Sequence, residues 1–238
     1  MNVLVFDIWG QFAHFKKIYA TTSAVSYPVP FKTTIYGLVA AIIGLDKTEN
    51  AYLKDFEEGK CLVALQLLNR VQMQRININL QPHYNRLSEG GNRKPTATEF
   101  VRNPHYRIYF YHQDTEIYNQ LHKHLKAHTA VYTPTLGLAY LLSNFNFVGE
   151  YHIQAQTEGK ALIHSVIPRK QLVRFDAVFE NENEIVEISQ YALEMDTDRN
   201  VTQRDDIFID RSTKSIPAVV KQYWQVPIEN NPQNIVFL

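Results

Sequence analysis

The stretch that most constrains the fold covers residues 27–44 and reads YPVPFKTTIYGLVAAIIG. Its two prolines prevent a helix from starting ahead of them. Thr33 or Thr34 can then cap a helix. The apolar residues that follow recur at helical spacing, and Gly44 suits the left-handed end of a helix. The segment therefore predicts an extended corner followed by one helix.

Strand and helix patterns on either side of this segment give the order β-α-β-β-α-β. Residues 3–9 are apolar on both faces, which is typical of a central strand. Asp114 can cap a second helix with one apolar stripe. Further strands are expected at residues 61–71, 106–112 and 147–156, with a short helical stretch at residues 136–142. This is the order of a ferredoxin-like α+β fold, which we expect over residues 1–158.

An additional hairpin is expected after the second of these strands. There the polar residues Arg75, Asn77 and Asn79 alternate with aliphatic residues. This alternation predicts a strand with one polar face, as in a projecting hairpin. Residues 81–98 are polar and contain two adjacent glycines, which indicates a mobile loop. We therefore place a protruding hairpin at about residues 73–99.

The pattern changes from about residue 159 onward to short apolar runs between polar and acidic connectors. Such runs are typical of short strands. They occur at residues 161–167, 171–179, 207–209 and 235–237. We expect residues 159–238 to form a small, mostly β C-terminal part.

The chain is neutral overall, with 24 basic and 24 acidic residues, but its charge is unevenly distributed. Residues 61–112 carry a net charge of +5, and residues 129–238 carry −5. This asymmetry favours one face for a polyanion and another for a protein partner or for solvent. An ordinary solvated surface remains the alternative.

Cys61 is the single cysteine, so no disulfide can form within the chain and no cysteine-based metal site is expected. No apolar run approaches the ~18 residues that a membrane-spanning helix needs. The N-terminus opens on a strand pattern and not on a signal peptide. These features predict a cytoplasmic protein that makes no contact with a membrane.

The helix expected after the prolines offers a site for phosphate. Free N–H groups and the positive end of the helix dipole gather at a helix N-terminus. Gly37 in the first turn would let a nucleotide approach the backbone, and Lys16, Lys17 and Lys32 could add charge. The residues alone leave open the alternative of a capped helix that packs on a sheet and binds nothing.

Three motifs follow one another in the first 150 residues. The first motif consists of Phe15-Lys16, the YPVP corner and a helix of the pattern Thr-x-x-Gly-Leu-x-x-x-x-x-Gly. The second is TEFVRNPHYRIY at residues 98–109. The third is PTLG at residues 134–137. Together they resemble the fifth Cas protein family, the RAMP-type subunit of type I Cascade complexes. Lys16 stands where that family commonly has Arg, and Thr135 where Tyr is common. The length and Lys16 are most similar to type I-B members.

The resemblance implies a ferredoxin-like RAMP core with a protruding β-hairpin, the thumb. It also implies an RNA-binding role in antiviral defence, in which the subunit would hold the 5′ handle of the guide RNA (crRNA). The subunit would contact the Cascade backbone subunit and the large subunit. It would meet target DNA through the complex. Together with the polar side chains of the expected hairpin, it assigns the following residues to RNA: Phe15, Lys16, Lys17, Tyr27, Lys32, Thr33, Thr34, Gly37, Arg75, Asn77, His83, Tyr84, Arg86, Arg93, Lys94, Arg102, Leu136 and Gly137.

Most members of that family are non-catalytic, but type I-C members cut precursor RNA with Tyr, Lys and His. Metal-free cleavage needs a base, a cation and an acid. His122, Lys123 and His124 could supply them with Tyr36 as a further member, but adjacent helical residues point about 100° apart. His14 is a more isolated candidate. We expect no catalytic residue, no cofactor and no metal, with repeat-RNA endoribonuclease activity as the alternative.

A third hypothesis is that the protein binds single-stranded RNA on its own, outside any complex, as RRM proteins do. The RRM fold is similar, but its aromatic RNP1 pattern is absent from the chain. Motifs for nucleotide hydrolysis and for serine hydrolases are absent as well.

Overall fold

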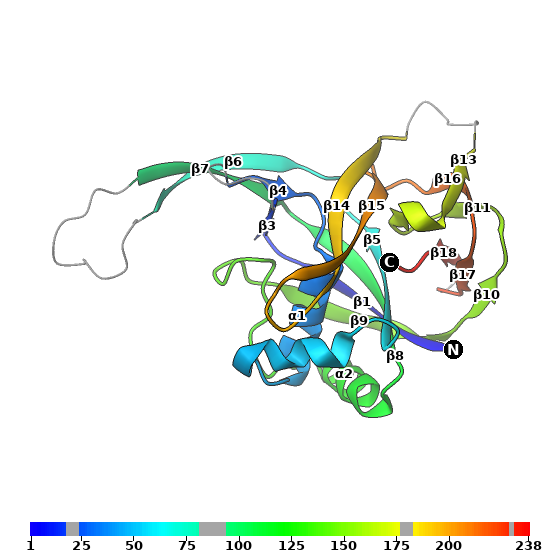
Figure 1. Ribbon diagram of the computed structural model, residues 1–238, viewed down its shortest axis with the longest axis horizontal. Helices are drawn as coiled ribbons and strands as arrows, with labels where there is room; N and C mark the ends of the chain where they lie inside the picture. Colours follow the sequence, from blue (N-terminus) through cyan, green and yellow to red (C-terminus); the bar gives the residue numbers. More distant parts are fainter. Residues whose placement is uncertain (18–23, 81–93, 177–182, 229–230) are drawn as a thin grey trace.

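A computed structural model describes residues 1–17, 24–80, 94–176, 183–228 and 231–238 of the 238-residue chain. At its centre is an antiparallel sheet with the strand order β5-β8-β1-β9. The strands are β1 (Asn2–Trp9), β5 (Cys61–Leu67), β8 (His105–His112) and β9 (Asn144–His152). These are the four strands of the predicted order, arranged 2-3-1-4, so the ferredoxin-like α+β fold is confirmed (Figure 1).

Helices α1 (Lys32–Ile43) and α2 (Thr115–Ala127) lie on one face of this sheet. The end of α1 is as predicted, because Gly44 is left-handed with φ 82°. The predicted cap is wrong: α1 begins one residue before Thr33, and its N-cap Phe31 has no side chain that can accept a hydrogen bond. The preceding prolines fix the extended corner and set the start of the helix instead.

The cap of α2 is confirmed, since the carboxylate of Asp114 accepts a hydrogen bond from the backbone of Glu116 at 2.8 Å. The short helix expected at residues 136–142 is wrong. There the chain forms a tight loop in which Leu136 donates a backbone hydrogen bond to Leu141 at 2.9 Å. A 3₁₀ segment, η1 (Thr48–Phe56), follows α1.

The thumb is a hairpin of β6 (Met73–Leu80) and β7 (Lys94–Arg102), which projects from the body (Figure 1). The predicted loop over residues 81–98 extends too far, because residues 94–98 belong to strand β7. Residues 81–93 lie outside the described part of the chain. Short strands brace the base of the thumb: β2 (Phe12–Ala13) pairs with β7, and β3 (Phe15–Lys16) pairs with β4 (Ser26–Tyr27).

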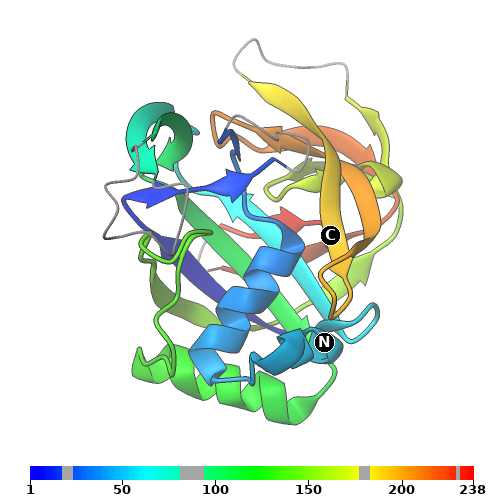
Figure 2. The same cartoon turned by 60° about the vertical axis from the view of Figure 1, so that its left-hand side comes forward.

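The C-terminal part is mostly β, as predicted. Its short elements are β11 (Gly159–Ile163), β12 (Ile167–Pro168), η2 (Arg169–Gln171), β13 (Leu172–Phe175), β16 (Ile216–Val220), β17 (Tyr223–Val226) and β18 (Gln233–Ile235). The sequence did not predict its largest element, a long hairpin of β14 (Ile185–Met195) and β15 (Val201–Asp210) that curves over α1 (Figure 2). The strand expected at residues 147–156 is divided, and its second piece, β10 (Gln154–Gln156), pairs with β17.

Both faces of the central sheet are covered in part by C-terminal residues. On the helix side, Tyr191 and Leu193 of β14 join the core made by the helices and the sheet. On the opposite face, Val226 and Phe237 pack on Val3 and Val5 of β1. The predicted boundary after residue 158 falls between β10 and β11, and each core contains side chains from both sides of it.

Among the described residues, no helix combines the length and the apolar character needed to cross a membrane.

Candidate nucleic-acid interface

A groove of about 710 Å³ lies between α1, the segment that follows α1, the loop at residues 132–137 and the turn of the β14–β15 hairpin. Its walls include Thr33, Thr34 and Gly37 from the first motif and Gly137 from the third. These residues are about 100 positions apart in the chain, and the fold brings them to one place. The groove is therefore the feature of the structure that unites two of the sequence motifs.

The loop on the far side of the groove is held by an unusually close backbone contact. Gly137 has φ 100°, and a Cβ atom built on it would lie 1.9 Å from the carbonyl oxygen of His14. The neighbouring residue, Leu136, is buried, and its carbonyl accepts a hydrogen bond from the backbone N–H of His14 at 3.0 Å. Glycine is required here because any side chain would push the loop away from the first strands.

Gly37 has a different role in the opposite wall. A Cβ atom at this position would make only ordinary contact, 3.6 Å from the hydroxyl of Tyr52. The missing side chain leaves space in the groove itself. Threonine hydroxyls, Tyr52 and Tyr132 also line this space, together with the cations Lys47 and Arg199 and one carboxylate, Asp46. With two cations and one acid, the lining suits a polar, negatively charged chain with planar groups.

The base of the thumb carries the next group of predicted residues. Lys16 is exposed on β3, and the ammonium of Lys17 lies 5.5 Å from the ring of Tyr27. Phe15 and Tyr27 form a paired rung between β3 and β4, and both are buried. Their rings therefore support the surface that the two lysines expose.

The exposed strand of the thumb presents polar side chains as predicted. Arg75 and Asn77 are exposed on β6, whereas Ile76 and Ile78 are partly covered. Arg75 lies opposite Glu99 on β7, with 3.6 Å between its Nε and the carboxylate. Since the Arg75 side chain is 75% exposed, this pair leaves the guanidinium accessible.

Arg102 is exposed at the end of β7. His83, Tyr84, Arg86 and Arg93 lie outside the described residues, as does the side chain of Lys94.

Comparison with known proteins now identifies the family. A family model described as "CRISPR-associated protein (Cas_Cas5)" matches residues 3–206. The chain belongs to this Cas5 family. No curated protein matches the sequence. The chain is similar to a CRISPR protein from Archaeoglobus fulgidus, with 13% identity, a TM-score of 0.60 and coverage of 98% of this chain and 99% of the other. A chain of a CRISPR RNA-guided surveillance complex matches with 10% identity, a TM-score of 0.47 and coverage of 92% and 90%.

One residue assigned to RNA in this Cas5-family chain requires correction. Lys32 is 6% exposed, and its ammonium lies 2.6 Å from the carboxylate of Glu194 on β14. The hydroxyl of Tyr36 donates to the same carboxylate at 3.1 Å. Burial raises the pKa of Tyr36 well above its ordinary range, so this phenol stays protonated. Lys32 holds the β14–β15 hairpin against α1 and does not reach the groove.

The residues considered for RNA cleavage have separate partners. The ring of His122 packs on Phe147, and His124 interacts with the hydroxyl of Thr129 at 3.1 Å. Lys123 is exposed between them. Nδ1 of the buried His14 lies 2.8 Å from the carbonyl of Glu99, so this nitrogen carries the proton. The described geometry does not bring these groups together.

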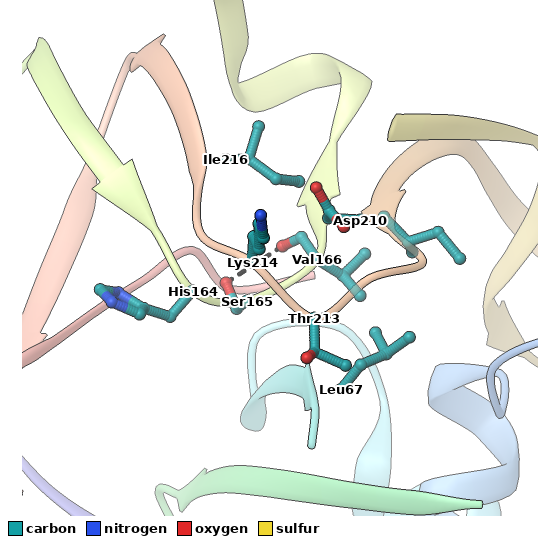
Figure 3. A pocket seen from close by; sticks show the side chains of 9 residues that line it. Leu67, His164, Ser165, Val166, Asp210, Thr213, Lys214 and Ile216 are labelled. Atoms are coloured by element: carbon teal, nitrogen blue, oxygen red, sulfur yellow. Dashed lines mark hydrogen bonds between the residues drawn. The ribbon is translucent and has the colours of Figure 1, made fainter. Parts of the chain in front are cut away.

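A second cavity, next to β12, is too small to bind a ligand (Figure 3). Its volume of about 10 Å³ allows at most one water molecule. Ser165 on its wall donates to the carbonyl of Val166 at 3.1 Å and accepts from the backbone of Val236 at 2.8 Å. Within the described residues, no group of three or more His, Cys, Asp or Glu side chains could hold a metal ion.

Two cations of the groove, Lys47 and Arg199, are not among the residues predicted from the sequence. Arg199 comes from the β14–β15 turn, where its Nε donates to Asn50 at 2.9 Å. Lys47 lies just after α1, and a pattern search could have found it from its position next to the first motif. Nothing in the sequence around Arg199 links it to α1, because that contact depends on the unpredicted hairpin.

Proposed function

We propose that this Cas5-family chain is the non-catalytic subunit that binds the 5′ handle of the guide RNA in a type I Cascade complex, of type I-B. The observation that carries the proposal is the groove in which Thr33, Thr34 and Gly37 of α1 face Gly137. Because two motifs that define the family resemblance line one groove, the groove is where we place the RNA.

The chemistry of the groove supports this placement. Lys47 and Arg199 supply positive charge for phosphates, and the threonine hydroxyls supply donors. The Tyr132 side chain, which is 56% exposed, offers a ring on which an unpaired base can stack. In this proposal the cations at the base of the thumb, exposed Lys16 and partly exposed Lys17, continue the RNA path toward Arg75.

An exposed apolar surface supports assembly with other subunits. Val131, Tyr140 and Leu142 are 54–61% exposed, and all belong to the loop between α2 and β9. Large apolar side chains exposed in one loop are a feature of protein contact sites. We propose that the backbone subunit and the large subunit cover this loop and the thumb, and that target DNA meets the protein only within the complex.

A direct test uses labelled repeat RNA and purified protein in EDTA. Binding of RNA that ends in the 5′ handle, without cleavage, is the expected result. Specific cleavage would instead favour the metal-independent endoribonuclease, and binding of unrelated single-stranded RNA as tightly as handle RNA would favour an independent RNA binder.

Gly37→Leu should weaken binding of handle RNA roughly ten-fold, which is about 1.4 kcal/mol. Leucine is a good helix former, so α1 should keep its structure while the new side chain fills the groove. The matched control is Gly37→Ala, whose Cβ meets only Tyr52 at 3.6 Å. Filter binding compares the two variants, and thermal unfolding checks that both fold. Equal affinity for RNA would place the RNA elsewhere.

Lys16→Ala should reduce the salt dependence of RNA binding by about 0.7 in the slope of log K against log salt concentration, the value of one phosphate contact to a single strand. Lys16 is exposed and adjoins the thumb. Lys123→Ala, which removes an exposed cation from α2, should leave the slope unchanged. If both variants have the parental slope, Lys16 does not contact the RNA backbone.

A further inference from the structure

A second hollow, of about 520 Å³, lies at the root of the thumb. The hollow opens beside Trp9. Side chains alternate along a strand, so Trp9 lies on the same face of β1 as Val3 and Val5, which is the face of the central sheet opposite the helices. Asn69, just before β6, and Asn103, just after β7, contribute to its walls. The hollow is therefore bounded by both legs of the thumb and is separate from the groove at α1.

The aromatic wall of the hollow is built on the two central strands of the sheet. Trp9 on β1 is paired in register with His105 on β8, and their ring centroids are 5.7 Å apart. Both side chains are partly exposed. Aromatic side chains on the central strands of an RRM sheet stack on unpaired bases. The pair Trp9 and His105 offers a comparable surface at this position.

The floor of the hollow is polar without carrying net charge. Arg107 donates to both carboxylate oxygens of Asp7, at 2.7 and 2.9 Å. This two-point pair neutralises the guanidinium. Burial lowers the pKa of the neighbouring His105, which favours its neutral form near pH 7. The hollow therefore suits a neutral planar group better than a phosphate.

Several hydrogen-bonding groups around this floor remain available. In the described part of the chain, neither the side-chain amides of Asn103 and Asn146 nor the indole N–H of Trp9 has a hydrogen-bond partner. Asn69 uses its amide donor on the carbonyl of Asn103 at 3.1 Å and keeps its oxygen as an acceptor. Amide groups present a donor beside an acceptor, the pattern with which side chains read the edges of bases.

We infer that this hollow binds one unpaired nucleobase of a single-stranded nucleic acid, stacked on Trp9 and contacted at its edge by Asn103 and Asn146. This site goes beyond the proposed handle groove, because it lies on the opposite face of the central sheet and none of the groove residues line it. A strand that follows the thumb to its root would reach it.

Tryptophan fluorescence tests the inference directly. The chain has two tryptophans, so Trp224→Phe leaves Trp9 as the only reporter. Trp224 packs against Phe237, and phenylalanine keeps an aromatic ring there. Titration with an octamer of adenylate should quench Trp9, whereas an octamer of abasic ribose phosphate, with the same charge, should not. Equal quenching by both octamers would overturn the inference.

Two variants separate this site from the groove and from a protein contact. Trp9→Ala should weaken binding of the adenylate octamer about ten-fold, the effect of one lost stacking contact. Asn146→Ala, at an exposed position, should weaken it without affecting folding. Gly37→Leu should leave the quenching of Trp9 intact although it weakens binding of handle RNA. If Trp9→Ala and Asn146→Ala bind the octamer normally and fail only to assemble with other subunits, the surface docks a protein and the inference is wrong.

Discussion

Glu194→Ala should destabilise the protein by about 3–5 kcal/mol, the usual effect of removing one member of a buried ion pair. The ammonium of Lys32 would remain buried beneath β14 without its partner, which now lies 2.6 Å away. The hydroxyl of Tyr36 would lose its acceptor at the same time. Urea unfolding measures this change in the free energy of unfolding. The slope of that free energy against urea concentration should stay the same, because it depends on the surface exposed on unfolding.

The matched control is Glu187→Ala on the same strand. Glu187 pairs with Arg169 at 3.4 Å, and both side chains are largely exposed, so its loss should change stability by no more than about 1 kcal/mol. Replacing both buried partners, Lys32→Met with Glu194→Leu, should recover much of the lost stability because no unpaired charge remains. Equal effects of Glu194→Ala and Glu187→Ala would contradict the structural role assigned to the buried pair.

The same hairpin explains what sequence reasoning could not reach. Strand and helix periodicity located the central sheet and both of its helices, since those signals are local. The sequence predicts an RNA contact for Lys32 because its charge could add to a phosphate site at the helix N-terminus. Its partner is 162 residues away in a run of acidic residues that suggested a solvated connector. Only the pairing of β14 with β15 places that carboxylate over α1.

The candidate groove shows the same division between local and distant information. Thr34 and Gly37 could be found from the helix pattern and its resemblance to a family, whereas Arg199 could not. Phe15 and Tyr27 were recognised as important, but their pattern does not distinguish a ring that stacks on RNA from one that is buried. The structure decides this point, because both rings are 2% exposed. Trp9 was treated as part of a central strand, and the hollow beside it depends on the course of the thumb legs.

Gly137→Ala should destabilise the protein by about 3 kcal/mol or more and should also weaken binding of handle RNA. A non-glycine residue at φ 100° is strained by about 1–3 kcal/mol. The added Cβ would overlap the carbonyl oxygen of His14, now 1.9 Å from that position, so the loop must move. Movement would break the hydrogen bond from His14 to Leu136, and leaving such a buried group unpaired costs about 1–3 kcal/mol.

Gly37→Ala provides the contrast within the same groove. Its helical backbone accepts a side chain, so the alanine should be neutral or stabilise α1 by up to about 1 kcal/mol. Urea unfolding and RNA binding, measured in parallel on both variants, should therefore show losses of stability and affinity for Gly137→Ala and no loss of either for Gly37→Ala. A Gly137→Ala protein as stable as the parent would mean that the loop tolerates displacement, and the close contact with His14 would then not define the groove wall. The two glycines line one groove, but one is required by the backbone and the other leaves room for the ligand.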